Sequence, residues 1–220
     1  MTVSTFERFL PWSGVVAGLA WVGQDGFAHL YSVDRPGAGS IDVTNSHALL
    51  NVASLACVVV MGVALLFFAT AVRIRLRTAE AGESTYSSVA YGAWVTVAAS
   101  LAQMALWDKG MLSAADDGNA GAVQTLSYVQ YFGWLAMGIG ISTAFIAMGL
   151  GGLRLAALPR WFAVTTVVMG ALALLGACGI PPGGLVNYVL LPFWLVGAAI
   201  ILARRQKAAA ATPVELKVPA

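Results

Sequence analysis

Apolar stretches long enough to cross a membrane alternate with short polar breaks along the whole chain. The hydrocarbon core of a bilayer is about 30 Å thick, and a helix needs about 20 apolar residues to cross it. Six stretches meet this length, at residues 9–31, 47–72, 86–107, 124–151, 160–178 and 185–203. The pattern therefore predicts an all-α fold, a polytopic membrane helix bundle with six transmembrane helices.

The polar breaks have the composition of turns. Segments such as "RPGAGSIDVTN", "DKGMLSAADDGNAG" and "GIPPGG" combine charged residues with glycine and proline, which interrupt helices. These breaks are too short to hold a separate soluble domain. We expect one transmembrane domain over residues 1–205, followed by a disordered cytoplasmic tail over residues 206–220.

Composition supports a membrane environment. Hydrophobic residues make up 59% of the chain and charged residues only 10%, whereas an ordinary soluble domain carries about 25% charged residues. The net charge of +2 is explained by basic residues that anchor helices at a membrane surface. The expected surroundings are a lipid bilayer, with no nucleic-acid partner.

The placement of basic residues predicts the orientation. Short cytoplasmic loops of membrane proteins are enriched in lysine and arginine. If the N-terminus is inside, only Arg35 and Lys109 lie outside. The remaining basic residues, Arg8, Arg73, Arg75, Arg77, Arg154, Arg160, Arg204, Arg205, Lys207 and Lys217, are then all cytoplasmic. We therefore expect both termini in the cytoplasm, N-in/C-in.

In its general character the chain resembles the small uncharacterised six-span integral membrane proteins of actinobacterial type. The likeness covers the whole chain and rests on three features: the six-span plan, the preference for arginine over lysine, and spans rich in alanine, glycine and valine. It implies a multi-pass protein of the bacterial plasma membrane. It carries over no catalytic residue and no activity.

The segment "WVGQDGFAHLY", residues 21–31, places two ionisable residues near the outer end of the first span. On a helix, Asp25 and His29 continue a face that begins with Gly14 and Gly18, whose spacing lets another helix approach closely. We therefore expect this face to point into the bundle. Two interpretations stay open: an interfacial pair that touches water, or a buried pair that marks a site.

Further polar residues lie in the outer halves of the other spans, whereas the inner halves are mainly apolar. In the third span, Thr96, Ser100 and Gln103 share one face. This asymmetry suggests an outward-facing polar cavity, although polar groups that bond between helices and a wet rim would give the same pattern. Gly138 is a further candidate for close helix packing. The candidate ligand-binding residues are Asp25, His29, His47, Asn51, Gln103, Trp107, Asp108, Tyr131, Trp134 and Asn187.

The histidines and cysteines carry no metal-binding motif. Neither an HExxH nor a CxxC spacing occurs in the sequence, so we expect no metal site. Haem held by His29 and His47, at similar depth on neighbouring antiparallel spans, is the alternative to having no cofactor. We expect no disulfide between Cys57 and Cys178. Cys57 lies several turns into the second span and Cys178 ends the fifth, and a disulfide would need both side chains at the same depth and facing each other.

Three spans open on similar segments. "WSGVVAGLA" from Trp12 resembles "WVTVAASLA" from Trp94, and "WFAV" from Trp161 repeats the opening. One interpretation is three parallel helical hairpins, a known transporter design. The other is chance similarity between spans rich in alanine and valine, with tryptophan preferring the interface.

Three classes of function fit the sequence. The favoured one is binding or transport of a small solute or amphiphile through the outward-facing cavity, with Asp25 as the titrating residue. The first alternative is an intramembrane enzyme that uses Asp25 as acid or base on an apolar or lipid substrate, although no catalytic motif accompanies it. The second is an accessory or scaffold subunit that binds a membrane-protein partner or another copy of itself.

Overall fold

The structure is a computed structural model, and it describes residues 5–29 and 41–211, except for the side chains of His29, Trp134 and residues 209–211. Within these ranges every regular element is helical, as the sequence predicted. The elements are α1 (Thr5–Phe9), the 3-10 turn η1 (Leu10–Trp12), α2 (Ser13–His29), α3 (Ile41–Ser46), α4 (Ala48–Ala79), α5 (Thr85–Asp116), α6 (Ala120–Arg154), α7 (Arg160–Ala177), α8 (Gly183–Leu185), the π-helical turn η2 (Val186–Leu190) and α9 (Leu191–Ala211).

Five helical segments in the described part are long and apolar enough to cross a membrane: α4, α5, α6, α7 and the continuous stretch Gly183–Ala208. The first predicted span is represented by α2, which has 17 residues. Its expected continuation to Tyr31 falls outside the described residues. The chain is thus an all-helical protein of the kind found in membranes.

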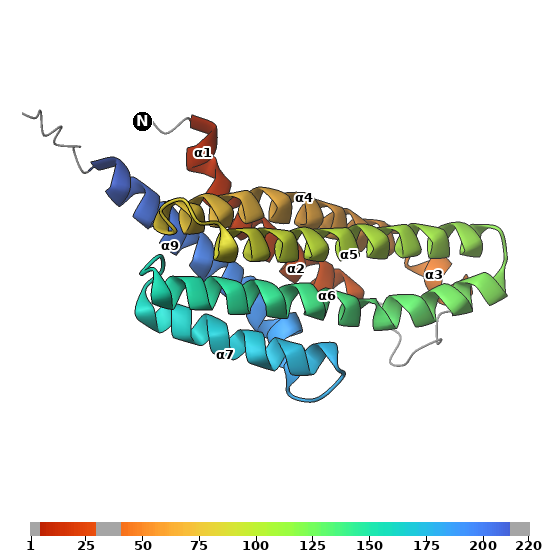
Figure 1. The fold of residues 1–220 in the computed structure, drawn as a ribbon. Helices are drawn as coiled ribbons and strands as arrows, with labels where there is room; N and C mark the ends of the chain where they lie inside the picture. The colour runs from red at the N-terminus through yellow and green to blue at the C-terminus, as the bar shows by residue number, and fades with distance from the viewer. Residues whose placement is uncertain (1–4, 30–40, 212–220) are drawn as a thin grey trace, which may run out of the picture.

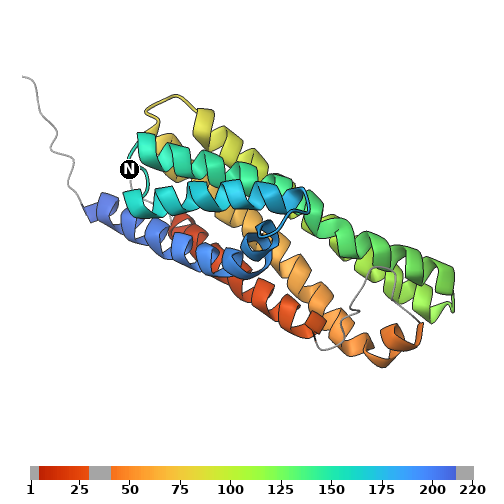
Figure 2. The same ribbon diagram turned by 90° about the horizontal axis from the view of Figure 1, so that it is seen from below.

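Consecutive long helices run in opposite directions (Figures 1 and 2). From α2 to α7 each packs against the next, and α9 packs mainly against α2. α1 and the C-terminal end of α9 lie at the same end of the bundle as the α4–α5 and α6–α7 connections. We call this end the basic end, because Arg77, Arg154, Arg160 and Arg204 lie at or near the helix termini that meet there. α3 and the α5–α6 connection lie at the opposite, distal end.

The predicted break at "DKGMLSAADDGNAG" is wrong for most of its length. α5 continues to Asp116 and α6 begins at Ala120, so the turn comprises only residues 117–119. The extra turns form because their apolar residues have partners: Met111 and Ala115 pack with Val123 across the hairpin. As a result α5 and α6, about 48 and 52 Å long, extend past the α7–α8 connection (Figure 1).

The last helix is also longer than expected. α9 runs to Ala211, whereas the sequence analysis ended it near residue 203 and expected disorder from residue 206. Alanine has the highest helix propensity, and the run Ala208–Ala211 extends the helix past its polar residues. The Gln206 side chain donates a hydrogen bond to the Glu7 carbonyl, which ties this extension to α1.

The centre of the bundle is an aromatic core to which five helices contribute. Trp194 of α9 stacks on Trp94 of α5, at 5.8 Å between ring centroids, and on Phe162 of α7, at 5.6 Å. Phe68 of α4 and Phe145 of α6 complete it. Because all five rings are buried, this aromatic core fixes the mutual positions of α4, α5, α6, α7 and α9.

The two tryptophan N–H groups of the aromatic core have partners. Trp194 Nε1 donates to Thr166 Oγ1 at 2.9 Å, and Trp94 Nε1 donates to Met148 Sδ at 3.3 Å. By contrast, Trp12 and Trp161 are exposed. Of the three tryptophans that open the similar sequence segments, only Trp94 is buried, so their packing does not follow one repeated pattern.

The glycines of α2 serve contacts within the chain. A Cβ atom at Gly14 would lie 2.7 Å from Phe68 of α4, and one at Gly18 would lie 2.8 Å from the Pro192 carbonyl of α9. Only glycine permits α2 to approach these neighbours so closely. The face that carries Gly14 and Gly18 thus points into the bundle.

Candidate functional site

The structure brings three of the predicted ligand-binding residues together around the π-helical turn. Trp21 Nε1 of α2 donates to the Tyr188 carbonyl at 3.2 Å. Asp25 of α2 and Tyr131 of α6 both lie near the Tyr188 phenol. With Asn187, these residues form a group that we call the π-turn cluster: Trp21, Asp25, Tyr131, Asn187 and Tyr188.

Pro192 explains why Trp21 belongs to this cluster. A proline has no N–H, so the helical donor that would reach the carbonyl four residues earlier is missing. That carbonyl belongs to Tyr188, and the Trp21 indole donates to it instead. This replacement hydrogen bond from α2 depends on the close packing of Gly18 against Pro192.

Asn187 occupies the most unusual position in the cluster. Its side chain is 3% exposed, and its Oδ1 atom has no hydrogen-bond partner among the described residues. A Cβ atom at Gly138 of α6 or Gly176 of α7 would lie 3.1 or 2.9 Å from Asn187 Nδ2. The two glycines thus leave room for the amide between α6 and α7, which places Gly138 at a helix contact and beside a candidate site residue.

The π-helical geometry of η2 is a second feature that favours a binding site around Asn187. A π-helical turn inserts an extra residue into a helix, and such turns occur frequently at functional sites. Here the turn runs from Val186 to Leu190 and includes both Asn187 and Tyr188. It can present a fixed, buried acceptor to a ligand that carries a hydrogen-bond donor.

Asp108 belongs to a second polar contact. It is 8% exposed, and one of its carboxylate oxygens accepts a hydrogen bond from Gln130 Nε2 of α6 at 2.5 Å. Trp107 is half-buried beside it, and a Cβ atom at Gly133 would lie 2.7 Å from its ring. Both residues therefore hold α5 against α6, and this packing role accounts for their positions without a ligand.

His47 and Asn51 join α3 to α4. His47 Nδ1 lies 3.0 Å from the Val43 carbonyl oxygen, and Asn51 Nδ2 donates to the Thr44 carbonyl at 3.2 Å. Asn51 is buried and His47 half-buried. These contacts satisfy backbone carbonyls near the end of a short helix, as side chains at helix ends commonly do.

Gln103 is exposed, which corrects the inward orientation expected for the face it shares with Thr96 and Ser100. The hydroxyl groups of Thr96 and Ser100 donate to carbonyls of their own helix, four residues earlier, and so need no partner on another helix. The inward face of α5 instead carries the larger apolar residues Trp94, Val97, Leu101 and Met104, followed by Asp108.

Two candidate ligand-binding residues have side chains that the structure does not describe. His29 ends α2 and Trp134 lies in α6, but neither side chain belongs to the described part. Haem ligation by His29 and His47 therefore stays a prediction. Among the described side chains, no three His, Cys, Asp or Glu residues come together as a metal site would require. Cys57 and Cys178 are both free.

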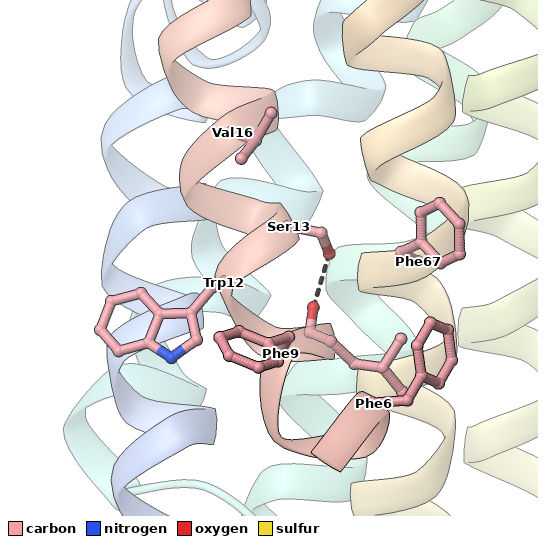
Figure 3. Close-up of a pocket in the computed structure, with 7 residues that line it drawn as sticks. Phe6, Phe9, Trp12, Ser13, Val16 and Phe67 are labelled. Atoms are coloured by element: carbon pink, nitrogen blue, oxygen red, sulfur yellow. Dashed lines mark hydrogen bonds between the residues drawn. The ribbon is translucent and has the colours of Figure 1, made fainter.

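Two hollows in the described part lie away from the π-turn cluster, and both have apolar walls. One, of about 320 Å³, lies where α1, η1 and α2 meet α4, and the other, of about 350 Å³, continues between α2 and α4. Figure 3 shows Phe6, Phe9, Val16 and Phe67 around the first. The sequence predicted a polar cavity at the opposite end and not this groove, although Phe6 and Phe9 stand on either side of Glu7 and Arg8 where the first span begins.

No known protein family matches the chain, and neither a curated protein nor a solved structure shows significant similarity to it. The likeness to actinobacterial membrane proteins therefore stays a prediction.

Proposed function

We propose that the protein is a six-span integral membrane protein of the bacterial plasma membrane, with both termini in the cytoplasm, and that it binds a small solute or amphiphile at the π-turn cluster. The ligand carries at least one hydrogen-bond donor, because the site offers an acceptor. In this arrangement the distal end of the bundle and the π-turn cluster face outward, and the basic residues of the basic end remain in the cytoplasm.

The observation that carries this proposal is the unpartnered Oδ1 atom of Asn187. A buried acceptor without a hydrogen bond costs about 1–3 kcal/mol of stability. Buried polar groups are nearly always satisfied in proteins, and an exception needs an explanation such as a ligand or a water molecule. Asn187 is 3% exposed, so bulk solvent does not satisfy it.

Two neighbours make the position suitable for a ligand. Asp25 of α2 is half-buried and Tyr131 of α6 is 48% exposed, and both lie near Tyr188, the residue after Asn187. The cluster therefore joins a buried acceptor to partly accessible polar groups from separate helices. Ligand sites commonly combine apolar walls with a few fixed polar groups in this way.

A thermal-shift screen tests the proposal. Full-length protein purified in detergent is heated with a panel of amines, amino acids and single-chain amphiphiles, and unfolding is followed by intrinsic fluorescence. A ligand present at 100 times its Kd stabilises the folded state by about 2.7 kcal/mol, which raises the unfolding temperature. We expect Asn187→Leu to abolish this rise, because it removes the acceptor.

The variant Asn51→Leu is the matched control. Asn51 is buried like Asn187, but its side chain donates to Thr44, so this substitution should lower stability by about 1 kcal/mol and leave the response to ligand intact. Asn187→Leu should instead leave the unliganded protein equally stable or more stable. If Asn187→Leu destabilises the protein as Asn51→Leu does, and ligands still raise its unfolding temperature, the proposal is wrong.

The alternatives gain less from the structure. The scaffold interpretation draws support from glycines that would receive a helix of a partner protein. Those glycines already make close contacts within the same chain: Gly14, Gly18, Gly138, Gly149 and Gly152. A role for Asp25 as the acid or base of an intramembrane enzyme stays a prediction, as does association with a membrane-protein partner or a second copy.

A further inference from the structure

A groove at the basic end has walls that offer only apolar surface. We call it the α1–α4 groove, and it is lined by Phe6, Phe9, Leu10, Trp12, Ser13, Val16 and Phe67. It continues into the second hollow through three shared residues, Ser13, Val16 and Phe67. Together the two hollows follow the boundary between α2 and α4, starting at α1.

The walls of the α1–α4 groove have no free hydrogen-bonding group in their middle. Its only hydroxyl, that of Ser13, donates to the Leu10 carbonyl at 2.5 Å and is already satisfied (Figure 3). Phe6 packs edge to face against Phe67 at 6.1 Å between ring centroids. An elongated hydrocarbon chain is the occupant that fits such walls, because it needs no hydrogen bonds.

The end of the groove at α1 has the opposite character. Arg8 lies between Phe6 and Phe9 in the sequence of α1, and its side chain is exposed. Neither the Arg8 guanidinium nor the Trp12 indole N–H has a hydrogen-bond or ion-pair partner in the described ranges. Arg8 thus adds a cation to the same short helix as Phe6 and Phe9, which line the groove, and Trp12 adds a neutral donor within the lining. Arginine and tryptophan are residues that commonly meet lipid headgroups at membrane surfaces.

We propose that the α1–α4 groove binds an anionic phospholipid, with an acyl chain along α2 and α4 and the phosphate at Arg8 and Trp12. Such a lipid has an apolar chain that matches the walls of the groove and an anionic phosphate that matches Arg8 and the Trp12 N–H. A second copy of the chain would have to insert an apolar ridge and also supply an anion for Arg8. The site is separate from the π-turn cluster and does not depend on the proposed ligand or on the orientation in the membrane.

Native mass spectrometry of the full-length protein tests this proposal. The protein in detergent is titrated with phosphatidylglycerol and, separately, with phosphatidylcholine of the same acyl chains. We expect phosphatidylglycerol to bind more tightly and Arg8→Gln to weaken its binding about five-fold, which corresponds to about 1 kcal/mol for one basic residue near an anionic headgroup. Arg160→Gln is the matched control, because Arg160 is exposed at the same end of the bundle but begins α7.

A second pair of variants tests the groove itself. Val16 lines the groove and is 47% exposed, so Val16→Phe should fill the groove without disturbing the core and should lower phosphatidylglycerol binding at least five-fold. Leu19→Phe is its control, since Leu19 is 65% exposed on the same helix and does not line the groove. Equal binding of the two lipids, no effect of Arg8→Gln, or no difference between Val16→Phe and Leu19→Phe would each overturn the proposal. So would a dimer that Val16→Phe dissociates while lipid binding is unchanged.

Discussion

Single residues close the basic end of the bundle through hydrogen bonds to backbone groups. The Glu80 carboxylate, at the end of α4, accepts hydrogen bonds from the Tyr86 N–H and from both the N–H and the hydroxyl of Ser87, which lie in the first turn of α5. The first N–H groups of a helix have no partner within it, and a carboxylate also complements the positive end of the helix dipole. Glu80 therefore performs the capping that Ser84, at the N-cap position, does not.

We expect Glu80→Ala to lower the free energy of unfolding by about 1–2 kcal/mol, because three donors lose their acceptor. The measurement is thermal unfolding of the purified protein in detergent. Glu83→Ala is the control: Glu83 is exposed in the same connection and its side chain caps nothing in the described structure. Equal effects of the two substitutions would contradict the capping role.

Two arginines act in a similar way on the neighbouring connection. Arg75 Nε of α4 donates to the Ala157 carbonyl, and Arg205 of α9 donates to the Ala156 carbonyl. The connection between α6 and α7 is thus held from both sides. From the sequence these arginines indicate only the orientation in the membrane, because their hydrogen-bond partners are backbone carbonyls, which a residue pattern does not reveal.

At the scale of single residues, the sequence indicated candidates but not their contacts. Asp25, Tyr131 and Asn187 became candidates because polar residues are rare in apolar spans. The structure places them near one another, and their role in ligand binding stays a prediction. The inward orientation expected for Gln103 was wrong, because a helical wheel groups residues on faces but does not say which face is buried. The larger apolar residues decide this, since their burial outweighs that of residues whose hydroxyls bond within the helix.

Among the elements, α6 is the one whose sequence is most constrained by close packing. A Cβ atom at Gly140 would lie 2.7 Å from the Val97 side chain and 2.9 Å from the Ala93 carbonyl of α5. At Gly149 the corresponding contacts are with Val167 and Ala163 of α7. α6 therefore lies between two helices at backbone distance, and its glycines are spaced to allow both contacts.

Two glycine substitutions should have opposite effects on stability. Gly140→Ala should destabilise the protein by about 1–3 kcal/mol, because the new methyl group overlaps the α5 backbone and the helices must separate. Gly92→Ala should stabilise it by up to about 1 kcal/mol, since Gly92 lies in α5 with no atom within 4 Å of the added Cβ. Unfolding temperatures in detergent give both signs, and a stabilising Gly140→Ala would refute the close contact.

The elements themselves were largely predictable, and their ends were not. Apolar length found all five long segments, because a bilayer sets a minimum length for a span. It gives no maximum length, so the extensions of α5 and α6 around Asp116 and Ala120 were missed. They depend on a small apolar cluster of Met111, Ala115 and Val123 that forms only once the hairpin pairs.

For the whole molecule, the proposed orientation follows from where the basic residues gather. The test uses single cysteines in a Cys57→Ser, Cys178→Ser background, introduced at the exposed positions Glu83, Asp117 and Lys207. A membrane-impermeant maleimide added to intact cells should label only the cysteine at position 117, because the other two positions lie at the basic end. Labelling at position 83 or 207 without prior permeabilisation would show that the orientation or the number of spans is wrong.

The aromatic core has a consequence for what could move through the bundle. A water-filled route along the axis would have to pass the rings of Phe68, Trp94, Phe145, Phe162 and Trp194, which are buried and in mutual contact. Densely packed interiors do not open by small adjustments, because each ring is held by the others. In this conformation the aromatic core closes the axis of the bundle. A ligand could therefore occupy the π-turn cluster without opening a path for ions or protons. Passage of an ion or solute along the axis would need a second conformation in which Trp194 separates from its aromatic neighbours.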